Sequence, residues 1–269
     1  MCGAARAENE AGECRSARDA IVGSHNLHFG EEPPISGFAG SGTVFFTGCS
    51  LHCLFCQNYP ISQMAHGNAV SADELASYYL ELQERGAHNL NLVTPSHVNY
   101  QWFHALYIAA RRGFMLPVVY NSGGYDRVPV LALFDGVIDI YMPDAKYRDS
   151  ALSAKLSEAA DYPEVNALAL REMHRQAGPL VTDGHGVGVR GILVRHLMIP
   201  GEIDNTLKVM DDIAEINPEI PVSLMTQYFP AYKAHETPGL DRKVAREEYR
   251  VAEAHAIKLG LVNGYFQQI

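Results

Sequence analysis

Short apolar or β-branched runs alternate along most of the chain with longer segments of helical periodicity. The runs predict strands at residues 43–47, 89–93, 116–120, 137–142, 192–199 and 222–225, and residues 261–268 fit one more. The longer segments predict helices near residues 71–85, 100–112, 151–156, 163–176, 205–216 and 242–259. Ser71 and Glu74 have the spacing of a capping box at the start of the first helix. This alternation predicts an α/β fold with a parallel sheet covered by crossover helices.

Such a sheet can either stay open and doubly wound or curve into a full or partial barrel. A Rossmann sheet usually carries Gly-x-Gly-x-x-Gly after its first strand, whereas cysteines occupy that turn here. We therefore expect a partial (β/α)6 TIM-like barrel over residues 41–269, with residues 1–40 as an irregular N-terminal segment packed against it. The glycine-rich residues 184–188 lack the Lys-Ser/Thr pair of a phosphate loop, which favours a hairpin or flexible loop.

Composition narrows the possible functions. The 269 residues are 47% hydrophobic and 19% charged, which is ordinary for a globular protein. A net charge of −10 argues against broad binding to nucleic acid or to an anionic membrane surface. No stretch approaches the roughly 18 apolar residues of a membrane span, and the acidic N-terminus does not resemble a secretory signal, so we expect a cytoplasmic protein.

The five cysteines all lie within the first 56 residues, and this clustering indicates metal ligation rather than a disulfide framework. Cys49, Cys53 and Cys56 have the spacing Cys-x3-Cys-x2-Cys directly after the first predicted strand. Three thiolates can hold three corners of an iron–sulfur cube and leave the fourth iron open to a small molecule. The alternatives are unligated cysteines, or a zinc site that would need a fourth ligand such as His52 or Cys14.

This motif resembles that of the radical S-adenosylmethionine (SAM) superfamily, in which the position of Phe55 lies against the adenine. Residues 28–34 and 57–63 resemble pyruvate formate-lyase activating enzymes and their uncharacterised homologues, and the likeness covers nearly the whole chain. The resemblance implies a radical SAM partial barrel, a [4Fe-4S] cluster on the three cysteines, SAM, and a reductant such as flavodoxin or ferredoxin. Cys2 and Cys14 resemble the remainder of a cysteine segment in longer homologues, and we expect them to be unligated.

Polar residues follow one predicted strand after another, as a barrel enzyme requires at the carboxyl ends of its strands. The resemblance implies cofactor-binding roles for Phe55, Thr94, Ser96, Asn121, Ser122, Asp144, Lys146, Arg195 and Tyr228. It also implies a monovalent cation near Asn121, Met142 and Asp144. The chain departs from the superfamily where Thr94-Pro95-Ser96-His97 replaces Gly-Gly-Glu, and this removes a carboxylate.

Four polar side chains that follow or lie in these strands have simpler alternatives. Arg195 lies in an otherwise apolar strand, where a guanidinium needs a partner; the SAM carboxylate supplies one, and an internal salt bridge is the alternative. Asp144 and Lys146 could form a surface ion pair instead of contacting SAM. For His97, a structural hydrogen bond within a loop is favoured over contact with substrate.

The resemblance implies an enzyme that reductively cleaves SAM to a 5′-deoxyadenosyl radical, which takes a hydrogen atom from a substrate. One hypothesis is an activase that forms a glycyl radical on a partner enzyme. The alternative is a modifier of a small molecule or peptide, acting as an epimerase, oxidase or mutase. A third hypothesis is a non-catalytic module that binds the cluster or SAM.

Overall fold

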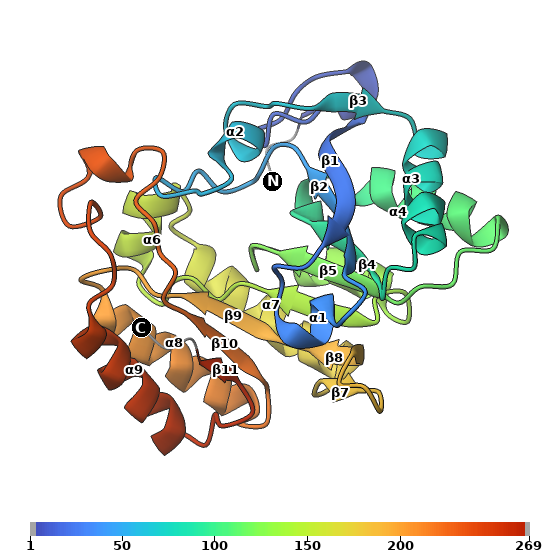
Figure 1. Cartoon of the computed structure of the whole chain (residues 1–269). Helices are drawn as coiled ribbons and strands as arrows, with labels where there is room; N and C mark the ends of the chain where they lie inside the picture. The colour runs from blue at the N-terminus through green and yellow to red at the C-terminus, as the bar shows by residue number, and fades with distance from the viewer. Residues whose placement is uncertain (1–3, 267–269) are drawn as a thin grey trace.

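The computed structural model describes residues 4–266, and six parallel strands that follow one another in space form its centre (Figure 1). In spatial order they are β2 (Ser41–Phe46), β4 (Leu90–Val93), β5 (Val118–Ser122), β6 (Ile140–Pro143), β9 (Val194–Leu197) and β10 (Val222–Met225). The strands belong to two sheets, which meet where Asp144 pairs with Arg195. The α/β fold and the six-strand order are as the sequence predicts.

Shorter strands extend both sheets. They are β1 (Ala20–His28), β3 (Asn68–Val70), β7 (Val181–Thr182), β8 (Gly188–Ile192) and β11 (Tyr265–Phe266). The larger sheet has the order β3-β1-β2-β4-β5-β6-β8-β7, and the smaller has the order β11-β10-β9. Because β7 and β8 are antiparallel across residues 183–187, the glycine-rich segment forms the predicted hairpin.

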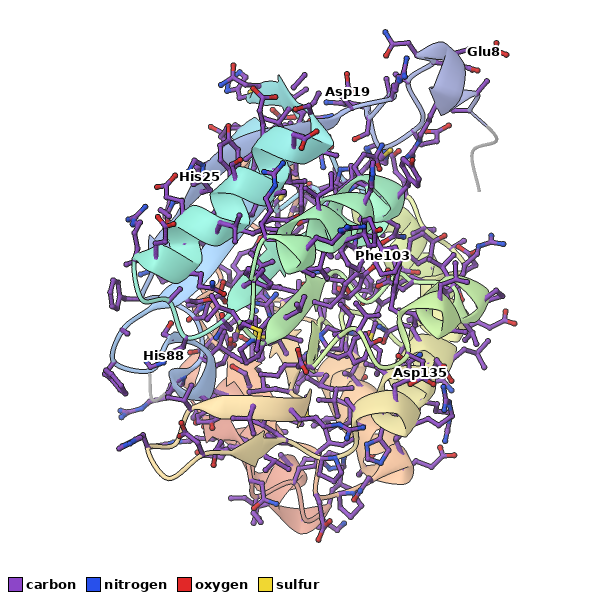
Figure 2. The ribbon with its side chains drawn as sticks, turned by 90° about the vertical axis from the view of Figure 1, so that its right-hand side faces the viewer. Glu8, Asp19, His25, His88, Phe103 and Asp135 are labelled. Carbon is purple, nitrogen blue, oxygen red and sulfur yellow. The ribbon has the colours of Figure 1, made fainter. Side chains whose placement is uncertain are left out.

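Helices follow the parallel strands along the chain. The longer ones are α3 (Ala72–Glu84), α4 (Asn99–Arg111), α6 (Ser150–Ser157), α7 (Tyr162–Ala177), α8 (Ile203–Ile216) and α9 (Arg246–Lys258). Single turns form α1 (Pro33–Ser36), α2 (Tyr59–Ser62) and α5 (Val128–Leu131). The helices α8 and α9 flank β9 to β11 in Figure 1, while α3 and α4 lie side by side in Figure 2. Among residues 4–266, no helix combines the length and apolar character that crossing a bilayer requires.

The strands bury different residues on their two faces, because side chains alternate along a strand. One face carries the main apolar core against the helices, with Leu92, Tyr120 and Val194 fully buried. On the other face, a small cluster of Ile35, Val119, Ile140, Met142 and Leu193 fills the inside of the curved sheet, with Ile35 supplied by α1. The inner face also carries polar side chains, because it includes Asn91, Asn121 and Arg195, which lie in register with these apolar residues.

Three predictions of local structure are wrong. Residues 1–40 are not irregular throughout, because β1 pairs with both β2 and β3. Its exposed Ser24 and half-buried His25 and Asn26 hide the apolar alternation that marks a strand. Residues 192–199 form two strands instead of one, since the chain leaves the larger sheet at Ile192 and enters the smaller one at Val194. The last long helix also starts later than predicted, at Arg246.

Candidate active site

The loop that follows β2 carries the three clustered cysteines and is fixed by backbone hydrogen bonds to the end of α6. His52 N donates to Ser157 O at 3.1 Å, and Leu54 N donates to Leu156 O at 2.9 Å. The Gln63 side chain donates to Leu51 O at 3.1 Å. Because α6 precedes β9 while the loop follows β2, these contacts join two distant parts of the chain around the cysteines.

The thiols of Cys49, Cys53 and Cys56 are free. Burial, together with the neighbouring Cys53 and Cys56 thiols, raises the pKa of Cys49 to about 12, and Lys146 opposes the shift. Burial likewise raises the pKa of Cys53, against the effect of Lys146. The Ser157 hydroxyl donates to Cys53 Sγ at 3.0 Å. The three thiols therefore lie close together beside a cation, with Cys53 buried and Cys49 and Cys56 half-buried.

Three thiols on one loop have the donor chemistry of an iron–sulfur cluster. Within residues 4–266, no group of three or more His, Cys, Asp or Glu side chains is arranged to hold one metal ion. The zinc alternative therefore gains no support. Three free thiols that influence one another's charge, with no disulfide among the described cysteines, suit a larger inorganic group that each thiol binds at a separate corner.

A network of charged side chains lies on the inner face next to these thiols. Lys146 Nζ contacts Asp144 Oδ2 at 2.6 Å, and the Arg195 guanidinium contacts Asp144 Oδ1 at 3.0 Å. Arg195 also donates to Asn121 Oδ1 at 2.6 Å and lies 3.4 Å from Glu31 Oε2. Burial alone would raise the pKa of Asp144, but Lys146 and Arg195 together hold it below its usual value.

This network changes the interpretation of Arg195. Asp144 and Glu31 supply its partners, so the alternative of an internal salt bridge is present in the structure, and contact with the SAM carboxylate stays a prediction. The pair between Asp144 and Lys146 is not at the surface, since each side chain is only 16% exposed. A role for these three residues toward SAM stays a prediction.

Glu31 is a member of the network that sequence reasoning missed. Its side chain is 9% exposed, and it accepts hydrogen bonds from Asn91 at 3.0 Å and Asn121 at 3.3 Å. Burial raises its pKa, while Arg195 acts in the opposite direction. The motif at residues 28–34 contains Glu31, yet only the pairing of β1 with β2 shows that it reaches the inner face.

The loops after β4 and β5 meet around a second missed residue, Asp126. Its carboxylate is buried and accepts from the hydroxyls of Tyr120 and Ser122, each at 2.8 Å. Burial raises the pKa of Asp126, and a hydrogen bond from Ser96 partly opposes that shift. Ser96 and Ser122, predicted to bind cofactor, thus have an internal partner in this structure. Their cofactor role stays a prediction.

Thr94 and His97 hold the loop after β4 in place. Thr94 adopts a left-handed backbone conformation with φ of 58°, and its N–H donates to Asn121 O at 2.8 Å. His97 is buried with Nε2 2.9 Å from Thr47 O, so the structural interpretation of His97 is confirmed. Gly124 lets the loop after β5 pack against the end of β6, because a Cβ there would lie 2.0 Å from the backbone oxygen of Asp144.

Phe55 and Tyr228 form an aromatic wall beside the cysteine loop. Their ring centroids are 5.8 Å apart and both side chains are buried. The Tyr228 hydroxyl donates to Leu240 O at 2.8 Å, so only the ring of Tyr228 remains to contact a ligand. Met142 lies in the small apolar cluster with Ile140, and the predicted cation near it stays untested.

Of the two cysteines outside the motif, the structure describes Cys14. Cys14 is a free, buried thiol whose Sγ lies 2.9 Å from the Arg6 guanidinium. Cys2 lies outside the described residues.

The parallel α/β sheet with a cysteine loop after its first parallel strand has the fold of SuiB. A crystal structure of SuiB from Streptococcus suis, bound to precursor peptide SuiA, matches 78% of this chain with a TM-score of 0.52 and 13% identity. A second SuiB structure, bound to S-adenosylmethionine, also matches 78% with a TM-score of 0.50 and 11% identity. The chain spans 43% and 42% of those two chains, respectively.

The sequence places the chain in a narrower group. It is 30% identical over 269 residues to the uncharacterized protein MJ0674 of Methanocaldococcus jannaschii, and the match covers 94% of this chain and 72% of that protein. The chain belongs to the family of that protein. No protein-family model matches the sequence.

Proposed function

We propose that this protein is a radical SAM enzyme that modifies a peptide or small molecule. One observation carries the proposal: three free, mutually close thiols lie on the loop after the first parallel strand of a fold shared with SuiB. One of the SuiB structures holds S-adenosylmethionine, which supports the same cofactor for this chain.

Cys49, Cys53 and Cys56 would hold a [4Fe-4S] cluster. When bound, that cluster supplies the electron that reductively cleaves SAM, and the resulting 5′-deoxyadenosyl radical abstracts hydrogen from the substrate. Two side chains near the cysteines favour the charged thiolates that such a cluster needs. Lys146 offsets the negative charge of thiolates at Cys49 and Cys53, and the Ser157 hydroxyl donates to Cys53.

The other residues predicted to bind SAM are aromatic, cationic or polar, and we propose a different role for each kind. Phe55 and Tyr228 present aromatic faces suited to the adenine, because flat rings pack together with little polar cost. Arg195 and Lys146 are the cations available to a SAM carboxylate, which would share them with Asp144. We assign the polar atoms of the cofactor to the amide and hydroxyl groups at the ends of β4 and β5, namely Asn121, Thr94, Ser96 and Ser122.

The substrate proposal favours the modifier over the activase. SuiB has been crystallised with a precursor peptide, and this supports a peptide as one substrate class for the present chain. Neither the fold comparison nor the family relative supports a glycyl-radical partner, and that hypothesis stays a prediction. A flavodoxin or ferredoxin remains the proposed reductant.

The test is anaerobic reconstitution with iron and sulfide, followed by addition of dithionite and SAM. We expect about four irons per chain from the proposed cluster and release of 5′-deoxyadenosine. Alanine at Cys49, Cys53 or Cys56 should lower the iron content and abolish release, while Cys14→Ala serves as the matched control that retains both. Equal iron loading of all four variants, or a fully loaded and reduced chain that never cleaves SAM, would overturn the proposal.

A further inference from the structure

A cavity of about 1160 Å³ lies between the N-terminal segment and the loops that follow β2, β4 and β5. Ser50 and His52, which stand next to the cysteines in the chain, form part of its wall. Sites that enclose a drug-sized molecule usually measure about 300–1,000 Å³, so this cavity has room for a longer ligand. Figure 2 shows Glu8 and Asp19 of the N-terminal segment together at one end of the molecule.

The wall made by the N-terminal segment is fastened to the barrel. Arg6 donates to the backbone oxygen of His97 and to Cys14 Sγ, and Cys14 is buried. The Gln101 side chain donates to the backbone oxygen of Arg18 at 2.8 Å. A Cβ on Gly48 would lie 2.3 Å from Cys14 O, so the segment packs directly against the start of the cysteine loop. The cavity is thus formed before any ligand arrives.

Within residues 4–266, four solvent-exposed charged side chains that line this cavity have no partner. Glu13 and Arg18 lie on the N-terminal wall, and Arg127 and Glu158 lie on the barrel wall. Within the described part of the chain, none of the four side chains forms an ion pair or a hydrogen bond. Asp126, which also lines the cavity, is by contrast fully engaged by neighbouring hydroxyls. Each wall therefore offers one unpaired charge of each sign.

We propose that this cavity binds a peptide segment of the substrate that carries both carboxylate and cationic groups. Arg18 and Arg127 receive the carboxylates, and Glu13 and Glu158 receive the cationic groups. A chain segment is favoured because the cavity exceeds the size of small-molecule sites and its charges lie on opposite walls. This inference rests on the proposed function, since it names the substrate class of that enzyme.

The test measures binding of fluorescein-labelled nine-residue peptide pools to the full reconstituted chain by fluorescence anisotropy. One pool contains an Asp and a Lys among random Gly, Ala, Ser and Thr; matched pools carry Asn for Asp, Gln for Lys, or both. We expect the mixed-charge pool to bind at least fivefold more tightly than the neutral pool. In Arg18→Gln/Arg127→Gln the advantage of Asp over Asn should disappear, and in Glu13→Gln/Glu158→Gln the advantage of Lys over Gln should disappear.

The controls are Arg250→Gln and Glu247→Gln, which make the same chemical changes on exposed side chains of α9 outside the cavity. Equal binding of all pools, no binding of any pool, or unchanged preferences in the two double variants would overturn the proposal. Competition by free glutamate and lysine at the same concentration as peptide would overturn the peptide assignment.

The outcome is separable from that of the proposed function. A chain that releases 5′-deoxyadenosine yet shows no charge preference for peptides refutes the cavity proposal alone. A chain that shows the preference yet never cleaves SAM when its cluster is loaded and reduced refutes the enzyme and leaves the peptide site standing.

Discussion

Replacing Arg195 with Met tests whether the buried charge network stabilises the fold. The guanidinium side chain is 16% exposed and contacts Asp144 at 3.0 Å and Glu31 at 3.4 Å. Removing one partner of a buried pair usually costs about 3–5 kcal/mol, because the other charge remains buried. We expect a loss of unfolding free energy near the lower end, at roughly 3 kcal/mol, because water still reaches the site and Lys146 still pairs with Asp144 in the variant.

The pH dependence of this loss has a defined sign. Burial raises the pKa of Glu31, and Arg195 opposes the shift, so Met at position 195 raises that pKa further. A folded carboxyl with a raised pKa binds more protons than the unfolded one, and the folded state gains stability as the pH falls. Asp144, whose folded pKa is low, gives stability above its unfolded pKa, and Met removes part of that. The Asp144 effect is the same at pH 5 and pH 8, since both lie above its unfolded pKa, so the Glu31 effect alone makes the difference between variant and wild type smaller at pH 5 than at pH 8.

The assay is chemical unfolding followed by circular dichroism, with wild type and variants in the same cluster state. Arg171→Met is the matched control, because Arg171 and Glu215 form a pair whose side chains are 49% and 69% exposed. That exposed pair should contribute less than about 1 kcal/mol. Adding Glu31→Gln to Arg195→Met should recover part of the loss. A cost for Arg195→Met no larger than that for Arg171→Met would refute the reasoning.

Three further predictions concern separate parts of the fold. Ser71→Ala removes the capping box of α3 and should lower the unfolding free energy by about 1 kcal/mol, whereas Ser77→Ala on the exposed face of the same helix should change it little. Gly124→Ala would place a Cβ 2.0 Å from a backbone oxygen and should yield little folded protein. The control is Gly113→Ala, where φ is also positive but no atom lies near the new Cβ; this variant should fold and be only modestly less stable in thermal melts. Burial lowers the pKa of His196 to about 4, so its contribution to stability is present above pH 6.5 and is lost as the pH falls toward 4. His196→Gln should therefore flatten the dependence of the urea midpoint on pH in that interval, and an unchanged slope would contradict the assignment.

The sequence by itself determined the features that depend on neighbours along the chain. Apolar runs and helical periodicity located β4, α4 and β10 to within a few residues, because burial of one face imposes a local pattern. The pairing of Ser71 with Glu74 also acts over three residues and is present in the structure. The spacing of the three cysteines is likewise a local property, and it predicted thiols on one loop after a strand.

Only the tertiary structure decided which side chains meet across the barrel. Glu31 and Arg195 are far apart in sequence, and their contact depends on β1, a strand whose partly exposed polar residues hide its periodicity. Asp126 collects the hydroxyls that follow β4 and β5 because parallel strands bring their carboxyl ends to one edge. A buried charge or hydroxyl takes whichever partner the fold brings within reach, and no pattern along the chain encodes that choice.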